Sequence, residues 1–271
     1  MLKRVLLIGF VSFSVISGLG CASQPQPIVN CRPIWRGLAF LVNQYNPTVG
    51  LLRESPEVAP HKYWLTNDNA LAACAFSKLG KPDMGQTLAA SMQRYGFATN
   101  GLIEVVWGAP IAWPPHVERQ VLISKIEQYE IWQEFHDSGP RFEDWQEYAN
   151  LALLGALHEH QQGRAENARI IFKQALEQFD GIGFNDKARR SPSGHGYYET
   201  YKLALALYVG AKIAAPMDGR GVQLFTALLQ KQAPLGGFTA LYDGTAAVGD
   251  ANTETTALAL LALDAYGCVG R

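Results

Sequence analysis

Four acidic residues recur at equivalent places along the chain, and their type suits acid–base chemistry. Each stands near the start of a run rich in Leu and Ala; the four are Asp68, Glu147, Glu199 and Glu254. Two carboxyl groups that face each other across a cleft can act as general acid and base, or as acid and nucleophile, when their surroundings separate their pKa values. Acids in a first helical turn also stabilise the helix dipole or cap free backbone NH groups, with no chemistry attached. Both interpretations stay open from the sequence.

A histidine accompanies one of these acids in a loop that contains glycine. Residues 193–199 place His195, Tyr198 and Glu199 where a loop enters a predicted helix, a position from which catalytic side chains are often presented. A single histidine in a polar loop is also common on protein surfaces without any function. The candidate catalytic residues are Asp68, Glu199, Glu254 and His195.

A polar segment ahead of the first acid is dense in hydrogen-bonding groups. Residues 53–69 could contact a ligand, although Asn67 could equally cap a helix, and Tyr63 and Trp64 could form a hydrophobic staple. All six tryptophans lie in the first 145 residues, and indole rings either stack on sugar rings or fill a core. The candidate ligand-binding residues are Arg53, Glu54, His61, Tyr63, Trp64, Asn67, Glu147, Tyr198 and Asp250.

The sequence lacks the motifs of several other classes of enzyme and binding protein. His-Glu-x-x-His and Cys-x-x-Cys are absent, so we predict no metal site and no cofactor. The absence of Gly-x-Ser-x-Gly, of the phosphate loop and of Gly-x-Gly-x-x-Gly after a strand argues against a serine hydrolase, a nucleoside triphosphatase and a dinucleotide enzyme. The net charge of -1 gives no field that attracts nucleic acid or an anionic membrane surface.

The first twenty residues have the features of a secretory signal. Lys3 and Arg4 precede an apolar run over 5–16 and a stretch of small residues, so we predict a signal peptide over 1–20 and a polar tether over 21–29. Gly20 and Cys21 resemble the junction of a bacterial lipoprotein. The sequence therefore predicts an exported protein that is either anchored to the membrane by a lipid on Cys21 or cleaved and secreted.

Export would place the four cysteines in an oxidising space. With Cys21 modified, at most one disulfide can form among Cys31, Cys74 and Cys268. The apolar helical pattern around Cys74 favours a buried free thiol there.

Helical periodicity dominates the mature chain and predicts one domain over 30–271. From Glu147 to Glu199 is 52 residues and from Glu199 to Glu254 is 55, a period that fits a pair of helices and their turns. The first helix of each pair is apolar almost all round and the second is amphipathic, as over 164–179, with a further flanking helix over 29–45. An insertion over about 96–139 carries predicted strands at 101–107 and 121–126. We predict a mainly α fold, an α/α toroid of about four helical hairpins with a small inserted β-hairpin region.

The end of the chain carries the sharpest likeness to known proteins. Residues 235–239, Leu-Gly-Gly-Phe-Thr, followed by 249–260 resemble the repeat of terpenoid cyclases and protein prenyltransferases, in which a Gly-Gly-Phe turn precedes an inner helix. The alternation of hairpins also resembles the six-hairpin glycosidases and polysaccharide lyases, whose toroids bind sugar chains in a concave mouth. These resemblances imply the fold alone. No catalytic residue is carried over from either group.

Three functions follow as hypotheses. In the first, the concave face binds a carbohydrate or a similar polar chain and, where its carboxylates are catalytic, cleaves it as a glycoside hydrolase or polysaccharide lyase would. In the second, the chain is a non-catalytic repeat protein of the cell envelope that engages a protein partner, and its acids are helix caps. In the third, an apolar cavity binds a terpenoid-like ligand.

Overall fold

Helices dominate the structure. The computed structural model describes residues 32–57, 63–99, 101–109, 111–192, 194 and 196–267, and about 50% of the chain is helical. The mainly α class that the periodicity predicts is thereby confirmed. Among the described residues no helix is long and apolar enough to cross a membrane.

Four α-helices of 13 residues each are buried on almost every side. They are α2 (Thr66–Lys78), α4 (Ala149–Gln161), α7 (Thr200–Lys212) and α9 (Thr253–Ala265). Their sequences alternate Ala with Leu around the whole helix, so each helix can be approached closely from several directions. Their apolar side chains form the centre of the hydrophobic core.

An amphipathic helix packs along each buried helix. Three of them follow their partner in the sequence: α3 (Pro82–Arg94) packs on α2, α5 (Ala165–Glu177) on α4 and α8 (Arg220–Leu229) on α7. The fourth, α1 (Arg32–Asn43), packs on α9 from the opposite end of the chain. The flanking helix predicted over 29–45 is therefore the outer partner of the last buried helix.

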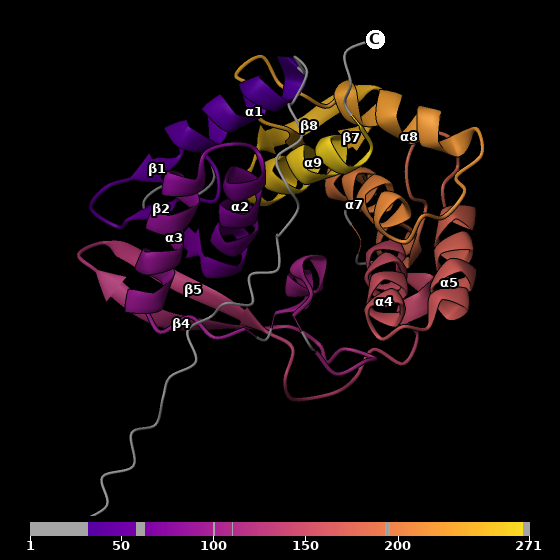
Figure 1. The fold of residues 1–271 in the computed structure, drawn as a ribbon, viewed down its shortest axis with the longest axis horizontal. Coiled ribbons are helices and arrows are strands. Elements are labelled where there is room, and N and C mark those ends of the chain that lie inside the picture. Colours follow the sequence, from indigo (N-terminus) through magenta and orange to yellow (C-terminus); the bar gives the residue numbers. More distant parts are fainter. Residues whose placement is uncertain are drawn as a thin grey trace, which may run out of the picture.

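The buried helices are neighbours in the order α2, α9, α7, α4, and α3, α1, α8 and α5 lie along their outer side (Figure 1). A short 3-10 helix, η1 (Leu102–Trp107), contacts both α2 and α4, the two helices at the ends of this row. The contacts of α9 with α1 and α2 bring the two ends of the described chain together.

Small sheets fix the starts of three buried helices. Strand β3 (Tyr63–Leu65) pairs in parallel with β5 (Tyr129–Phe135), whose antiparallel neighbour is β4 (Arg119–Ile126). Strand β6 (Tyr198–Glu199) pairs with β7 (Thr239–Asp243), which pairs with β8 (Ala246–Ala251). Strands β3, β6 and β8 lead into α2, α7 and α9. The remaining short elements are β1 (Tyr45–Asn46) with β2 (Leu51–Leu52), η2 (Trp145–Glu147) and α6 (Lys187–Arg190).

The insertion is only partly as predicted. Residues 121–126 are a strand, inside β4, and its partner is β5. Residues 102–107 are the helix η1 and not a strand, because Glu104 accepts hydrogen bonds at the start of this segment and Gly108, with a φ of 93°, ends it. Its apolar side chains are buried between two helices, where β-branched residues are favourable without any strand pairing.

Cys74 is buried in α2 and is disulfide-bonded, so the prediction of a free thiol there was wrong. Its partner lies outside the described residues. Apolar periodicity places the side chain in the core, but it carries no information on which distant segment reaches that side chain. A disulfide of this kind is typical of proteins exported to an oxidising compartment.

Candidate active site

The segment around Glu54 connects the starts of α2 and α9. The side chain of Asn69 accepts from Leu52 N at 2.7 Å and donates to Leu52 O at 2.9 Å, which fixes β2 against α2. Glu54, two residues after Leu52, is bound from the side of α9. Thr253 N donates to Glu54 O at 2.8 Å, and Asn252 Nδ2 donates to Glu54 Oε1 at 3.1 Å. The Glu54 carboxyl is therefore fixed between the two helix starts that carry Asp68 and Glu254.

Asp68 and Glu54 form a pair of carboxyl groups in hydrogen-bonding contact. Asp68 is only 4% exposed. Burial first, and then the negative charge of Glu54, raises the pKa of Asp68 well above its usual range. Two carboxyls can share a hydrogen bond only when one of them carries the proton, so the raised pKa of Asp68 favours its protonated form in this pair.

Glu134 joins the group from β5. Its backbone N donates to Asn67 Oδ1 at 2.8 Å, so Asn67, one position before Asp68, places the strand against the start of α2. Gln120 Nε2 donates to Glu134 Oε1 at 3.4 Å. Burial raises the pKa of Glu134 to about 8, with help from the charges of Glu118 and Glu54.

Glu254 lies in the first turn of α9 and is half-buried. Burial raises its pKa well above the usual range, and the charges of Glu134, Glu54 and Glu199 raise it further. The carboxyls that interact with one another thus come from α2, α9, β5, β6 and the segment after β2. We call Glu54, Asp68, Glu134, Glu199 and Glu254 the carboxyl cluster.

Glu199 is paired with a buried lysine of the described chain. Lys202, one turn along α7 and 1% exposed, forms ion pairs with Glu199 and with the fully buried Asp186, 2.6 Å away. Asp186 also accepts from Ala149 N at 2.9 Å and caps α6. This network ties the starts of α4 and α7 together and fixes the Glu199 carboxyl beside Lys202.

The cluster acids do not cap the helices on which they stand. The N-cap residues of α2 and α7 make no side-chain capping hydrogen bond, and α9 is capped by Asn252, which accepts from Thr255 N at 2.9 Å. Glu199 is itself the N-cap residue of α7, and its carboxyl lies on Lys202. Capping therefore does not account for the acids at these helix starts.

Aromatic side chains accompany the cluster. Tyr63 and Trp132 form a tilted pair with ring centroids 6.2 Å apart, and the Tyr63 hydroxyl donates to Gln120. Burial and the charges of Glu134 and Asp68 raise the pKa of Tyr63. Tyr201 is half-buried, and burial with the charges of Glu199 and Glu254 raises its pKa as well. Glu254 and Tyr201 are thus strongly desolvated and yet keep some accessible surface.

Several predicted ligand-binding residues have structural roles instead. Trp64 is 1% exposed and packs edge-on against Tyr129, so its assignment to the ligand-binding set is corrected: it belongs to the core. Tyr198 is buried, stacks on Tyr242 and donates to Asp180 at 2.6 Å. Side chains on a strand point alternately to the two faces of the sheet, and the sequence alone does not show which of the two faces is buried in the core.

Other predicted residues lie beside the cluster or away from it. Arg53 donates to Gln44 Oε1 at 2.7 Å, and Asp250 accepts from Ser55 and from Glu57 N, so both support the Glu54 segment. Glu147 forms an ion pair with Lys187 at 3.3 Å and is not among the groups that act on the cluster. Cys21, His61 and His195 lie outside the described residues.

Sequence reasoning missed Glu104, Glu118, Glu134 and Lys202. Glu134 stands on β5, a strand that the sequence did not predict, and neither Glu134 nor Glu118, which directly precedes β4, carries a repeat signal. Lys202 follows Glu199 by three residues, the spacing of an ion pair on one helix face, and this spacing could have identified it.

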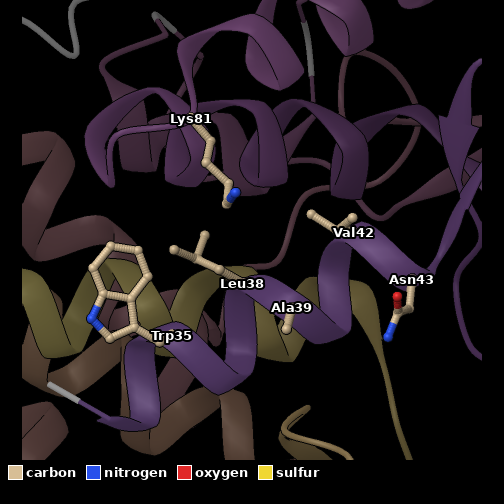
Figure 2. A pocket seen from close by; sticks show the side chains of 6 residues that line it. All are labelled: Trp35, Leu38, Ala39, Val42, Asn43 and Lys81. Carbon is tan, nitrogen blue, oxygen red and sulfur yellow. The ribbon is translucent and has the colours of Figure 1, made fainter.

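Two pockets on the described part of the chain lie away from the carboxyl cluster. One of about 350 Å³ is formed by α1 and the residue before α3, as Figure 2 shows, and it is lined by Trp35, Leu38, Ala39, Val42, Asn43 and Lys81. A second, of about 320 Å³, lies between α5 and the segment leading into α8. Neither contains a residue of the carboxyl cluster. No three His, Cys, Asp or Glu side chains of the described residues are grouped so that they could hold a metal ion.

The buried carboxyls predict a loss of stability with rising pH. Burial raises the pKa of Glu104 and Glu134 to about 8, so between about pH 5 and 8 the folded chain binds protons that the unfolded chain has released. In the window from pH 6.5 to 8, Glu104 alone removes stability with a slope of up to about 1.4 kcal/mol per pH unit. We expect the free energy of unfolding, measured by urea denaturation, to fall by at least about 1 kcal/mol across this window.

The window is chosen because two other groups oppose the trend outside it. His136, whose pKa burial lowers to about 4, adds stability as pH rises up to about 6.5, and Lys78, with a pKa of about 8, does so above pH 8. Glu134→Gln should reduce the slope, since Gln can still accept from Gln120 but does not ionise. A free energy of unfolding that stays constant or rises from pH 6.5 to 8 would contradict the assignment.

Comparison of the chain with protein-family models, with curated proteins and with solved structures gave no match in any of the three.

Proposed function

We propose that this chain is an exported α/α-toroid protein that binds and hydrolyses a carbohydrate chain at the carboxyl cluster. The single observation that carries the proposal is the meeting of carboxyls of two kinds: Glu254, with a raised pKa, and Glu199, ion-paired to Lys202. A protonated acid beside an ionised one is the arrangement that glycoside hydrolysis needs.

The assigned roles follow from these two environments. Glu254 donates its proton to the glycosidic oxygen as the bond to the anomeric carbon breaks. Glu199 either removes a proton from the attacking water or attacks the anomeric carbon itself, and the two routes give inversion or retention of the anomeric configuration. Lys202 fixes the Glu199 carboxylate in place. Tyr63 and Trp132 offer rings on which a sugar can stack.

The toroid is part of this proposal, and the order of the buried helices supports it. A row α2, α9, α7, α4 whose end helices both contact η1 is the arrangement of a ring of inner helices with one position filled by η1. In such a ring the helix starts that carry Asp68, Glu199 and Glu254 open on the same side. The disulfide at Cys74 supports export. Processing after residue 20, with or without a lipid on Cys21, belongs to the same proposal.

The polar character of the cluster favours this function over the binding of an apolar, terpenoid-like ligand. The non-catalytic alternative is a cell-envelope protein that binds a protein partner, and it leads to a different prediction. It requires the acids to act only as structural groups, whereas a hydrolase requires one neutral and one ionised carboxyl.

Purified protein comprising residues 21–271 can be screened against a panel of neutral, acidic and amino polysaccharides, with new reducing ends as the readout. We expect release of reducing ends from at least one member. The measured ratio of anomers in the first product then assigns Glu199 as base or nucleophile. If the protein neither binds nor cleaves any polysaccharide of the panel, the protein-binding alternative is the better one.

A further inference from the structure

The pocket between α5 and the segment that leads into α8 has an apolar floor. Its volume is about 320 Å³, which lies within the range of sites for small ligands. Phe172 and Leu176 of α5 are buried beneath it, and Met217 lines it as well. A Cβ atom at Gly210 of α7 would lie 2.7 Å from Met217 Sδ and 2.9 Å from Phe172 Cζ. Phe172 and Met217 therefore rest directly on the buried helix α7.

Positive charge dominates the lining of the same pocket. Three cations and one acid contribute to it: Arg169, Lys173, Arg220 and Asp218. Arg169 approaches Glu166 only to 4.0 Å, and no acid of the described chain forms an ion pair with Lys173 or Arg220. The net charge of the whole chain is -1, so this local excess of cations is not the consequence of a basic protein.

The positions of these cations are unfavourable for the helices that carry them. Arg169 and Lys173 stand four residues apart on α5, and like charges at this spacing repel each other on one helix face. Arg220 is the first residue of α8, whose first turn has no acid, although the helix dipole favours negative charge at this end. Helix stability therefore does not account for the three cations, whereas a bound anion would relieve both unfavourable arrangements.

The segment that faces α5 across the pocket has an unusual backbone. Ala214 and Asp218 have φ angles of 50° and 46°, in the left-handed region that is unfavourable for residues with a Cβ atom. They flank residues 215–217, which line the pocket, and Ala215 N donates to Gly210 O at 3.0 Å. The fold thus keeps an unfavourable backbone in a segment that shapes this pocket and fixes that segment to α7.

We propose that this pocket binds a small organic acid, in which a carboxylate is carried on an apolar chain or ring. The carboxylate meets the cations, and an arginine can bind it through two parallel hydrogen bonds. The apolar body of the ligand covers Phe172, Leu176 and Met217, and the flexible thioether of Met217 adapts to its shape. Such binding is separate from the carboxyl cluster and independent of the carbohydrate hydrolysis proposed above.

The methionine methyl groups allow a test at this position. Residues 21–271 contain Met84, Met92 and Met217, of which Met217 alone lines the pocket. In NMR spectra of protein isotope-labelled in these methyl groups, octanoate should shift the Met217 signal and leave the other two in place. The signal that is lost in Met217→Leu identifies it. Octanamide, which lacks the charge, and acetate, which lacks the apolar body, should each bind at least about tenfold more weakly than octanoate.

Lys173→Gln and Arg220→Gln should each weaken octanoate binding at least about fivefold, with little effect on octanamide, because only the carboxylate interacts with the charge. The matched control is Lys125→Gln, which removes an exposed cation on β4 and should change neither affinity. Unchanged Met84 and Met92 signals in the absence of ligand confirm that each variant is folded.

Three outcomes would overturn the proposal. Octanamide that binds as tightly as octanoate would show that the cations contribute nothing. An unshifted Met217 signal at about 10 mM octanoate would show that the acid does not enter the pocket. A Met217 signal that is shifted by a tetraglutamate peptide and not by octanoate would point instead to an acidic segment of a protein partner.

Discussion

Glu254→Gln is expected to lower kcat on the substrate found in the polysaccharide screen by about 10²–10⁴-fold, the usual contribution of a general acid. Gln has nearly the shape of the protonated carboxyl but no proton to donate. Because the raised pKa of Glu254 means that the folded protein prefers it neutral, the thermal stability of the variant at pH 8 should equal or exceed that of the unchanged protein. Turnover and stability therefore move in opposite directions.

The control for this experiment is Glu166→Gln, an exposed acid in the first turn of the outer helix α5, which should leave both kcat and the melting temperature unchanged. A substrate whose leaving group needs no protonation, such as a nitrophenyl glycoside, should be cleaved by Glu254→Gln with a much smaller loss. If Glu254→Gln keeps full turnover, or loses turnover only in proportion to stability, Glu254 is not the acid and the proposed mechanism fails.

Lys202→Met is expected to destabilise the protein by about 3–5 kcal/mol, because it leaves Asp186, which is 0% exposed, as a buried charge without its cation. Methionine fills a similar volume, so the loss arises from charge more than from packing. For a domain of this size the melting temperature should fall by about 6–20 °C. Adding Asp186→Asn should recover part of this loss, since the uncompensated charge is then removed.

Lys187→Met is the matched comparison. Lys187 also pairs with two acids, Asp144 and Glu147, but its side chain is 37% exposed, and a solvent-exposed pair of this kind contributes little to stability, so Lys187→Met should lower the melting temperature far less than Lys202→Met. Equal losses in Lys187→Met and Lys202→Met, or no recovery in the double variant, would show that the buried network does not hold the starts of α4 and α7.

The sequence by itself determined the helices and the positions of the acids along them. Apolar residues spaced at three and four positions specify a helix locally, and a run that is apolar all round has to be buried. For this reason α2, α4, α7 and α9 begin close to the predicted acids, and the helices predicted over 164–179 and 29–45 are observed as α5 and α1. The acids Asp68, Glu199 and Glu254 each lie within one turn of a helix start for the same local reason.

Which acids meet, and how the pKa of each is shifted, depends on contacts between segments that are far apart in the sequence. Glu54 reaches Asp68 and Glu254 because α9 packs on α2, a contact between residues nearly two hundred positions apart, and Glu134 joins them through a parallel pairing of β3 with β5. Burial and the charges of neighbouring groups set the pKa of each carboxyl, and both depend on the complete fold. Glu147 has the same place in the repeat as Glu199. However, Glu147 forms an ion pair with the partly exposed Lys187, whereas Glu199 forms one with the buried Lys202. The local sequence pattern determines the helix or strand in which a residue lies, whereas its neighbours in the folded protein determine its charge environment and its chemical role.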